Sequence, residues 1–203
     1  MKIAVVDYGM GNLRSVSKAI EHVAPQAEVL VTADPGRIAS ADKVVVPGQG
    51  AMRDCMRHLA ESGAREAVID AARQKPFLGI CIGLQMLFEH GEEGDTKGLG
   101  LLPGDVPRFR VSGLKIPHMG WNELGELKPH PLLAGIAARD HAYFVHSFQL
   151  KASREETVLA LTDYGGPITA VIGRDNLAGT QFHPEKSQAT GLRLIANFLA
   201  WKP

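Results

Sequence analysis

The stretch Pro76-Phe77-Leu78-Gly79-Ile80-Cys81-Ile82-Gly83-Leu84-Gln85 decides the fold. Its apolar first half, residues 76–80, predicts a buried strand, and a helix is expected to begin directly after the cysteine, over residues 84–89. A buried strand that passes into a helix through small residues is typical of parallel sheets, which helices cover on both faces. The stretch therefore predicts an α/β architecture with Cys81 at a junction of strand and helix.

The segments before this stretch repeat the pattern of strand, turn and helix. Residues 2–6 form a short apolar run that ends in Asp7-Tyr8-Gly9-Met10-Gly11-Asn12, and a helical spacing of apolar residues follows over 13–23. Two more strands are expected over 28–32 and 43–46. The second of them leads into Pro47-Gly48-Gln49-Gly50 and a long segment of mixed polar and apolar residues that extends to Ala72. This alternation favours right-handed βαβ crossovers.

After Gly91 the pattern changes, because glycine and proline become dense and the apolar runs become short. We expect this half to be more antiparallel, with strand-like runs over 106–111, 142–145, 158–161, 168–172 and 177–182. Ser187 is predicted to cap a final helix, whose apolar stripe faces the core. No repeat or linker divides the chain, so residues 1–203 are expected to form a single domain. The predicted fold is a three-layer α/β sandwich with a mostly parallel central sheet plus a small antiparallel portion.

The composition argues against partners that are recognised by charge. The 203 residues include 22 Lys and Arg and 22 Asp and Glu, and 45% of them are hydrophobic. A chain without net charge has no overall field that favours nucleic acid or an anionic membrane surface. A chain of this length and apolar content buries enough surface to fold without disulfides.

Two cysteines are too few for a disulfide-stapled secreted fold, and Asp7 interrupts the apolar start too early for a signal peptide. A cytoplasmic location is therefore expected. No apolar run approaches the roughly 20 residues that span a bilayer. The eight histidines form no zinc motif, and Gly9-Met10-Gly11 lacks the third glycine of a dinucleotide fingerprint, where Arg14 stands. We expect neither a metal nor a cofactor.

Cys81 lies in Gly79-Ile80-Cys81-Ile82-Gly83, which has the form of a nucleophile elbow. In such an elbow, small flanking residues let the strand turn sharply into a helix and present the central side chain. A helix N-terminus beneath the thiol favours its thiolate, and the backbone N–H of Ile82 is placed to stabilise an oxyanion. The alternative is a buried, inert cysteine, which is common in proteins. On the elbow alone the two interpretations are about equally balanced.

A second motif, Thr180-Gln181-Phe182-His183-Pro184-Glu185, favours catalysis. If the backbone is extended here, the period of two places His183 and Glu185 on one side, where the carboxylate orients the imidazole. The alternative is a capped turn before the last helix with a half-buried histidine. Together the two motifs supply a nucleophile, a base and an orienting acid, in the order Cys81, His183, Glu185.

The segment Pro47-Gly48-Gln49-Gly50 is a candidate for a second oxyanion donor. It follows a parallel strand, at the edge where such sheets gather their sites. The N–H of Gln49 would serve if the Gly48–Gln49 peptide reorients, a freedom that glycine provides. A plain turn between strand and helix is the alternative. Cys55 has no histidine or acid motif beside it and is interpreted as structural.

Five segments together resemble the class I glutamine amidotransferases, over nearly the whole chain. The cysteine elbow and His183-Pro184-Glu185 are shared by many members of that family. The segments at 7–12 and 117–122 are more similar to its histidine-biosynthesis branch. Two residues depart from that pattern: Gln49 stands where a small apolar residue is frequent, and Phe148 where tyrosine is frequent. The five segments are Asp7-Tyr8-Gly9-Met10-Gly11-Asn12, Pro47-Gly48-Gln49-Gly50, Gly79-Ile80-Cys81-Ile82-Gly83-Leu84-Gln85, Pro117-His118-Met119-Gly120-Trp121-Asn122 and His183-Pro184-Glu185-Lys186-Ser187.

The resemblance implies that Cys81 attacks the side-chain amide of glutamine, that His183 transfers the proton to departing ammonia and that Glu185 positions His183. It also implies which residues bind the substrate. These are Gly50, Gln85, Glu93 and the backbone of Ser147 and Phe148, with Glu92 an alternative to Glu93.

The resemblance further implies a heterodimer with a (β/α)8-barrel cyclase subunit that receives the ammonia, and glutaminase activity that is low without this partner. Four residues match the side that faces the cyclase: Asn12, Trp121, Tyr143 and Lys186. Without the resemblance, the two aromatic residues would be read as core and Lys186 as a solvated charge. Other functions remain open from the sequence: the glutaminase of pyridoxal phosphate synthase, a γ-glutamyl hydrolase, or a redox-sensing protein that uses Cys81 as an oxidisable thiol.

Overall fold

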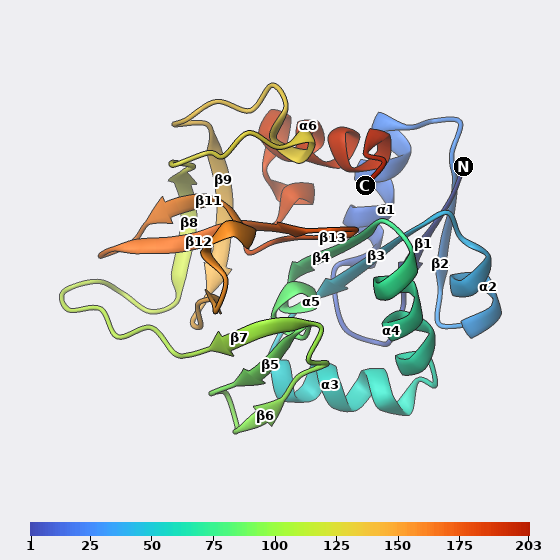
Figure 1. Ribbon diagram of the computed structural model, residues 1–203, viewed down its shortest axis with the longest axis horizontal. Coiled ribbons are helices and arrows are strands. Elements are labelled where there is room, and N and C mark those ends of the chain that lie inside the picture. Colours follow the sequence, from blue (N-terminus) through green and yellow to red (C-terminus); the bar gives the residue numbers. More distant parts are fainter.

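A seven-stranded sheet runs through the middle of the molecule (Figure 1), in a computed structural model that describes residues 1–203. Five neighbouring strands are parallel, and two antiparallel strands extend the sheet at one edge. The expected mostly parallel sheet with an antiparallel portion is confirmed. From that edge inward the strands are β11 (Val158–Asp163), β12 (Pro167–Arg174), β13 (Leu177–Thr180), β4 (Phe77–Cys81), β3 (Lys43–Gly48), β1 (Lys2–Val6) and β2 (Glu28–Thr32).

Helices cover both faces of this sheet (Figure 1), as a parallel sheet requires. On one face, α1 (Leu13–Val23) packs against α6 (Gln188–Ala200). On the other, α2 (Pro35–Ser40) packs against α4 (Arg65–Gln74), and α3 (Met52–Glu61) lies alongside the short helix α5 (Ile82–Gln85). None of the helices has the length and apolar content to cross a membrane.

Two small sheets flank the central one. The first contains β10 (Lys151–Ala152), β7 (Leu102–Val106), β5 (Phe88–Gly91) and β6 (Thr96–Lys97). The second is the antiparallel pair β8 (His118–Glu123) and β9 (His141–His146). Short 3-10 turns lie at η1 (Pro131–Leu133), η2 (Glu155–Thr157) and η3 (Pro184–Lys186).

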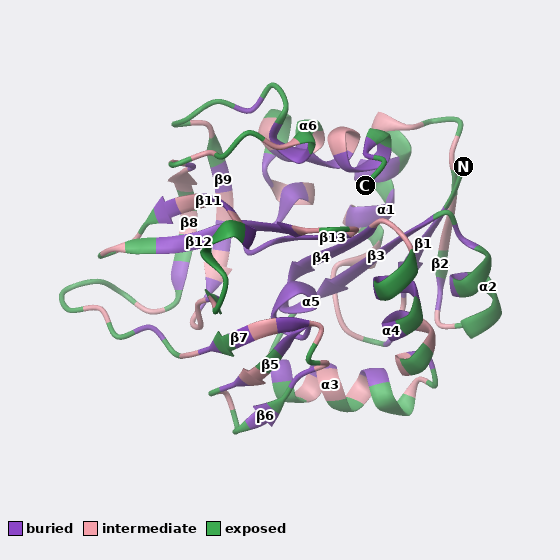
Figure 2. Ribbon diagram, viewed as in Figure 1, coloured by how far each residue is buried: buried purple, intermediate pink, exposed green.

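The hydrophobic core follows the central strands, which are drawn as buried along their length in Figure 2. Every residue of β3 and β4 is buried, which explains why their sequences are continuous apolar runs without polar alternation. α1 contributes Val16 and Ile20 to the core, and α6 contributes Leu194, Ile195 and Phe198. The expected helical stripes are therefore confirmed as core faces.

The helix expected over residues 84–89 is wrong. α5 ends at Gln85, and Phe88 to Gly91 form strand β5 instead. Backbone pairing with β7 and β6 takes these residues into a sheet, and such long-range partners lie outside any local helical pattern. The strand expected over 106–111 is also misplaced, because β7 ends at Val106 and only Arg108 bridges to Phe148 beyond it.

Ser187 precedes α6 as expected, but its side chain does not cap the helix. Its hydroxyl donates to the carbonyl of His183 at 2.6 Å and accepts the backbone N–H of Tyr143 at 2.9 Å. The residue therefore fastens the turn that carries His183 to strand β9.

Gly83 shows how closely α5 lies against β3. A Cβ at this position would overlap the backbone carbonyl of Val46, which has no side-chain freedom to move away. We expect Gly83→Ala to lower the free energy of unfolding by about 3 kcal/mol, the upper range for overpacking. Chemical denaturation would measure this loss. Gly125→Ala is the matched control, since a Cβ there meets nothing within 4 Å, and equal stability of the two variants would contradict the packing.

Candidate active site

The candidate site lies where the parallel strands β3 and β4 end side by side. Gly48, the last residue of β3, is paired in register with Cys81, the last residue of β4. The carboxyl ends of parallel strands are the edge at which open α/β sheets gather their sites. The expected position of Cys81 at a junction of strand and helix is confirmed.

Cys81 adopts the backbone conformation of a nucleophile elbow. Its φ is 53° and its ψ is −110°, a region that costs a non-glycine residue about 1–3 kcal/mol. Such strain persists only where the surrounding structure imposes it, and here Gly79 and Gly83 give the space for the close packing of α5. The thiol is 3% exposed. α5 has only four residues, so the expected helix N-terminus beneath the thiol is a single turn.

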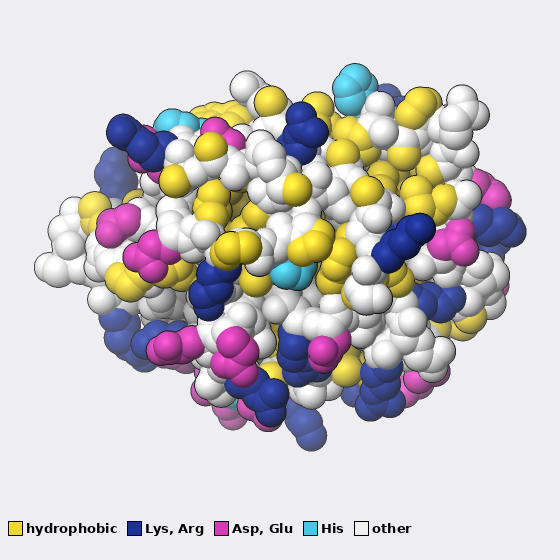
Figure 3. Space-filling model, turned by 45° about the horizontal axis from the view of Figure 1, so that its top comes forward, with side chains coloured by type: hydrophobic (Ala, Val, Ile, Leu, Met, Phe, Trp, Pro, Cys, Tyr) yellow, Lys and Arg dark blue, Asp and Glu magenta, His cyan; other side chains and the backbone are white.

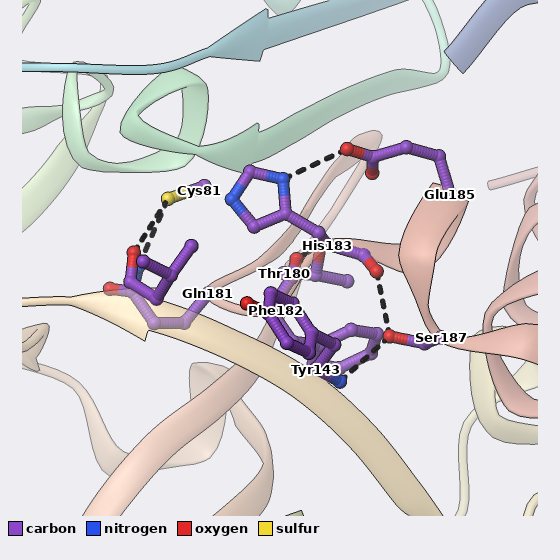
Figure 4. Close-up of polar contacts among 9 residues, drawn as sticks. Cys81, Tyr143, Thr180, Gln181, Phe182, His183, Glu185 and Ser187 are labelled. Carbon is purple, nitrogen blue, oxygen red and sulfur yellow. Dashed lines mark hydrogen bonds and ion pairs between the residues drawn. The ribbon is translucent and has the colours of Figure 1, made fainter. Parts of the chain in front are cut away.

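The imidazole of His183 lies between the thiol of Cys81 and the carboxylate of Glu185 (Figure 4). Its Nδ1 lies 2.9 Å from Glu185 Oε1, and the two side chains are 3% and 1% exposed. With Nδ1 engaged by the carboxylate, Nε2 is the atom left for the sulfur. The other oxygen of Glu185, Oε2, is buried and has no hydrogen-bond partner. The imidazole of His183 is therefore the group that this carboxylate contacts through a hydrogen bond.

The surroundings raise the pKa of His183. Burial by itself lowers the pKa, but the hydrogen bonds and negative charges of Cys81 and Glu185 together outweigh it and raise the pKa to about 9. His183 therefore carries its proton at neutral pH and offers a cationic partner to a thiolate at Cys81.

The sequence predicted the contact of His183 with Glu185, but for a different backbone. Strand β13 ends at Thr180, and the 3-10 turn η3 begins at Pro184. A turn therefore brings the carboxylate to the imidazole, in place of the extended backbone on which the expected pairing was conditional. The proline fixes φ at the first position of this turn.

A cavity of about 320 Å³ opens beside the thiol. Ten of the residues proposed from the sequence line it, and Pro117, Val145 and His146 complete the wall. Three cavities are larger, of about 400, 510 and 380 Å³, and none of them is lined by a cysteine or histidine. The last of the three adjoins the candidate cavity, with which it shares Glu93, Ser147 and Phe148. The ten are Gln49, Gly50, Cys81, Ile82, Gln85, Glu93, Ser147, Phe148, His183 and Lys186.

The structure separates Glu92 from Glu93. Glu92 faces away from the thiol, where its carboxylate accepts the backbone N–H of Arg108 at 2.8 Å and pairs with Arg110 at 2.7 Å. Glu93 lines the cavity, and one of its oxygens accepts the backbone N–H of Met52 at 2.6 Å. Glu93 is the one carboxylate among the cavity-lining side chains.

Both expected oxyanion donors adjoin the thiol. Ile82 is the first residue of α5, a position whose N–H has no acceptor inside the helix. Gln49 follows Gly48 along the adjacent strand. Two buried side chains hold the backbone around it: the hydroxyl of Tyr8 donates to the carbonyl of Pro47 at 2.7 Å, and the thiol of Cys55 donates to the carbonyl of Gln49 at 3.4 Å. Burial raises the pKa of both groups, so both keep their protons.

Sequence reasoning missed Gln181 as a neighbour of the nucleophile. Its side-chain amide donates to Cys81 Sγ at 3.8 Å (Figure 4), and its oxygen accepts from Gln85 at 3.1 Å. Gln181 is fully buried. The sequence signal for it was its position directly after β13 and two residues before His183.

Three of the four predicted partner-facing residues form a cluster next to this cavity. The rings of Trp121 and Tyr143 are 5.9 Å apart in a T-shaped arrangement, and Lys186 Nζ lies 5.9 Å from the centre of the Tyr143 ring. Trp121 is 48% exposed, so it is not a core residue, and its strand neighbour Met119 is 61% exposed. Asn12 lies at the start of α1, with no capping hydrogen bond from its side chain.

The surface carries no single sign of charge. On the face drawn in Figure 3, basic and acidic side chains are interspersed, and hydrophobic side chains are exposed across its middle. This agrees with 22 basic and 22 acidic residues in the chain. This chain exposes apolar side chains, Met119 and Trp121 among them. A surface of this kind suits an apolar contact better than recognition by charge.

The elbow cysteine, its histidine and the sheet that carries them define the class of protein. A family model described as glutamine amidotransferase class-I matches residues 4–201. A solved structure of a glutamine amidotransferase has the same fold, with a TM-score of 0.74 over 98% of this chain and 97% of that one, at 19% identity. The chain therefore belongs to the class-I glutamine amidotransferase family.

Within that family, curated relatives that are more than half identical to this chain are one kind of subunit. Imidazole glycerol phosphate synthase subunit HisH of Thiobacillus denitrificans is 55% identical over 99% of this chain and 92% of that protein. The HisH subunit of Aromatoleum aromaticum is also 55% identical, over 99% of both chains. The branch of the family to which this chain belongs is that of the HisH subunits.

Proposed function

We propose that this chain is the glutaminase subunit of an imidazole glycerol phosphate synthase in histidine biosynthesis. It hydrolyses glutamine to glutamate and ammonia, and a (β/α)8-barrel cyclase subunit consumes the ammonia. The observation that carries the proposal is Cys81 at a strained elbow, in a cavity that His183 also lines, with Glu185 buried behind the imidazole and in contact with its Nδ1. The 55% identity to HisH subunits favours this activity over a pyridoxal phosphate synthase glutaminase or a γ-glutamyl hydrolase.

The mechanism follows from the positions of these groups. The thiolate of Cys81 attacks the side-chain carbonyl carbon of glutamine, and a C–S bond forms. The negative charge that develops on oxygen is stabilised by the N–H groups of Ile82 and Gln49. His183 gives its proton to the amide nitrogen, the C–N bond breaks, and ammonia leaves a thioester on the enzyme.

Water completes the reaction. His183, now neutral, takes a proton from water as it attacks the thioester carbon, and the C–S bond breaks to release glutamate and restore the thiolate. Glu185 keeps the imidazole oriented through both steps. Ammonia released to neutral water would be mostly protonated and unable to attack, so transfer across a closed interface preserves it. The cluster of Trp121, Tyr143 and Lys186 is where we place that interface.

Glutamate release measured with and without the cyclase subunit and its nucleotide substrate tests the proposal. We expect the chain alone to turn over slowly and the complete complex at least tenfold faster, because closure of the interface completes the site. Reorientation of the Gly48–Gln49 peptide is the step on which this stimulation depends. Equal rates would contradict the gating, and no glutamate in either case would contradict the function.

Glu93 is expected to bind the α-ammonium of glutamine, because its carboxylate is the anionic group of the cavity. Glu93→Gln should raise the KM for glutamine about tenfold or more, the effect of losing one charge-assisted hydrogen bond. Glu92→Gln is the matched control, since Glu92 is engaged by Arg108 and Arg110. Steady-state kinetics of both variants measure the effect, and a larger KM change at Glu92 would reverse the assignment.

The raised pKa of His183 predicts the alkaline limit of activity. His183 holds the proton for the leaving ammonia below pH 9 and loses it as pH rises through about 9. kcat/KM should therefore fall on that side of the profile. In Glu185→Gln a group that raises this pKa is gone, so the fall should move to lower pH by about one unit or more. An alkaline limb that stays in place would exclude Glu185 as the partner of His183.

A further inference from the structure

Two further histidines, His146 in the wall of the cavity and His118 next to it, belong to a chain of buried hydrogen bonds. His146 Nδ1 lies 2.8 Å from the carbonyl oxygen of Phe148, and His146 Nε2 lies 2.9 Å from His118 Nδ1. His118 Nε2 lies 3.1 Å from the side-chain nitrogen of Asn122, which also donates to the carbonyl of Asp163 at 2.8 Å. The two histidines are 5% and 3% exposed.

The contacts fix the position of each proton in this series of hydrogen bonds. A carbonyl only accepts, so His146 carries its proton on Nδ1 and donates to Phe148. Its Nε2 is then an acceptor, and His118 must donate to it from Nδ1. His118 Nε2 accepts in turn from Asn122, whose nitrogen is identified independently by its second acceptor, the carbonyl of Asp163. The assignments made from the two ends agree.

Both rings remain neutral, as this pattern requires. Burial lowers the pKa of His118 to about 4, and burial, followed by the charges of His118 and His183, lowers the pKa of His146 to about 3. Aromatic packing holds the ring of His118, which stacks on Phe144 at 4.8 Å and on Tyr164 at 4.1 Å between centroids. The chain of hydrogen bonds is therefore held in place along its length.

The series of hydrogen bonds ends at the carbonyl of Phe148, a residue that lines the cavity. Ser147 and Phe148 both face the same space as Cys81. The carbonyl of Ser147 accepts the N–H of Phe109 at 3.0 Å, and the N–H of Gln149 donates to the carbonyl of Pro107 at 2.9 Å. The Gln149 N–H and the Phe148 carbonyl belong to one peptide group, and His146 supplies the donor for that carbonyl. Without His146 this peptide keeps only one of its two hydrogen bonds.

We propose that His146 and His118 are positioning residues for glutamine, which act through the Phe148 carbonyl to fix the backbone that holds the substrate. This inference rests on the proposed function, because it assigns a role in the binding of that substrate. The two histidines contribute to glutamine affinity and not to the chemical step.

Two substitutions at His146 separate the donor from the rest of the ring. Asn places an N–H near Nδ1 and keeps the bond to Phe148, whereas Gln places its amide near Nε2 and loses that bond. We expect His146→Gln to raise the KM for glutamine about tenfold, with kcat within about threefold of the wild type, and His146→Asn to restore most of the affinity. The assay is glutamate release by the complex with the cyclase subunit. His130→Asn, at a partly buried histidine outside the cavity, is the control for loss of an imidazole.

Alkylation of Cys81 by iodoacetamide supplies a readout that does not depend on glutamine, and its rate should match the wild type in both variants. An unchanged KM in folded His146→Gln would overturn the proposal. So would a loss of kcat and of alkylation without a change in KM, which is the signature of general disruption.

If His146→Gln does not fold, His118→Gln takes its place, because it removes the donor to His146. It should also raise the KM for glutamine, and an unchanged KM there overturns the proposal equally. If wild-type complex releases no glutamate, the proposed function fails; if it does and the variants bind normally, only the positioning role fails.

Discussion

Cys81→Ala is expected to abolish glutamine-dependent synthesis by the complex, with a loss of about 10⁴-fold or more. The thiolate is the only group at the elbow that can form the bond to the carbonyl carbon, and removal of a nucleophile leaves only the binding and oxyanion contributions. The substitution should not unfold the chain, because Ala fits the space of the thiol. It retains a side chain at the φ of 53° that the native cysteine already tolerates. Glutamate release and cyclase product, measured together, report the loss.

Added ammonium distinguishes loss of chemistry from loss of structure. Free ammonia reaches the cyclase without the glutaminase reaction, so the Cys81→Ala complex should synthesise product from ammonium at close to the wild-type rate. Failure of this rescue would indicate that Cys81 supports the assembly and is not the nucleophile. A redox-sensing role for Cys81 makes a different prediction: the protein would then be non-catalytic, and Glu185→Gln and His183→Ala would leave its function intact.

His183→Ala is expected to lower kcat/KM by about 10³-fold or more, because one side chain serves both proton transfers and stabilises the thiolate. The same change removes the partner of the buried Glu185 carboxylate, whose second oxygen already lacks one. His183→Ala should therefore also be less stable than wild type by about 3 kcal/mol, the cost of an unpaired buried charge.

Kinetics and chemical denaturation of His183→Ala, beside His130→Ala as the control for a partly buried histidine, measure both effects. If His183→Ala loses stability but keeps full activity, the role of this histidine is structural. A variant that keeps both its activity and its stability would contradict the whole assignment.

The sequence predicted the central sheet well, because its strands are distinguished by local signals. After the first lysine of β1 and of β3, the runs at β1, β3 and β4 are apolar because both faces of the sheet are covered. Glycine marks the end of each run, at Gly48 in β3 and shortly after β1 and β4 at Gly9 and Gly83. The elements that were misplaced depend on distant partners. β5 is a strand because β7 and β6 pair with it, and β8 exists through its pairing with β9. No local period reports such pairings.

The site was predictable where residue chemistry is unusual and not where backbone geometry decides. Cys81 and His183 stand in motifs whose residue types carry the reaction. The roles of Tyr8, Cys55 and His146 depend on which carbonyl each side chain reaches, and those carbonyls come from other elements. The choice between Glu92 and Glu93 required the bend after β5, which directs neighbouring carboxylates to opposite sides.

The most direct test of the nucleophile is a glutamine analogue that carries a diazoketone in place of the side-chain amide, applied to the complex with the cyclase subunit. Such a group alkylates a thiol only where the glutamine site presents one. Peptide mass mapping should find the adduct on Cys81 alone, blocked by excess glutamine and absent from His183→Ala, with Cys55 unmodified. An adduct on Cys55, or a Cys81 that reacts equally well with His183 removed, would contradict the account.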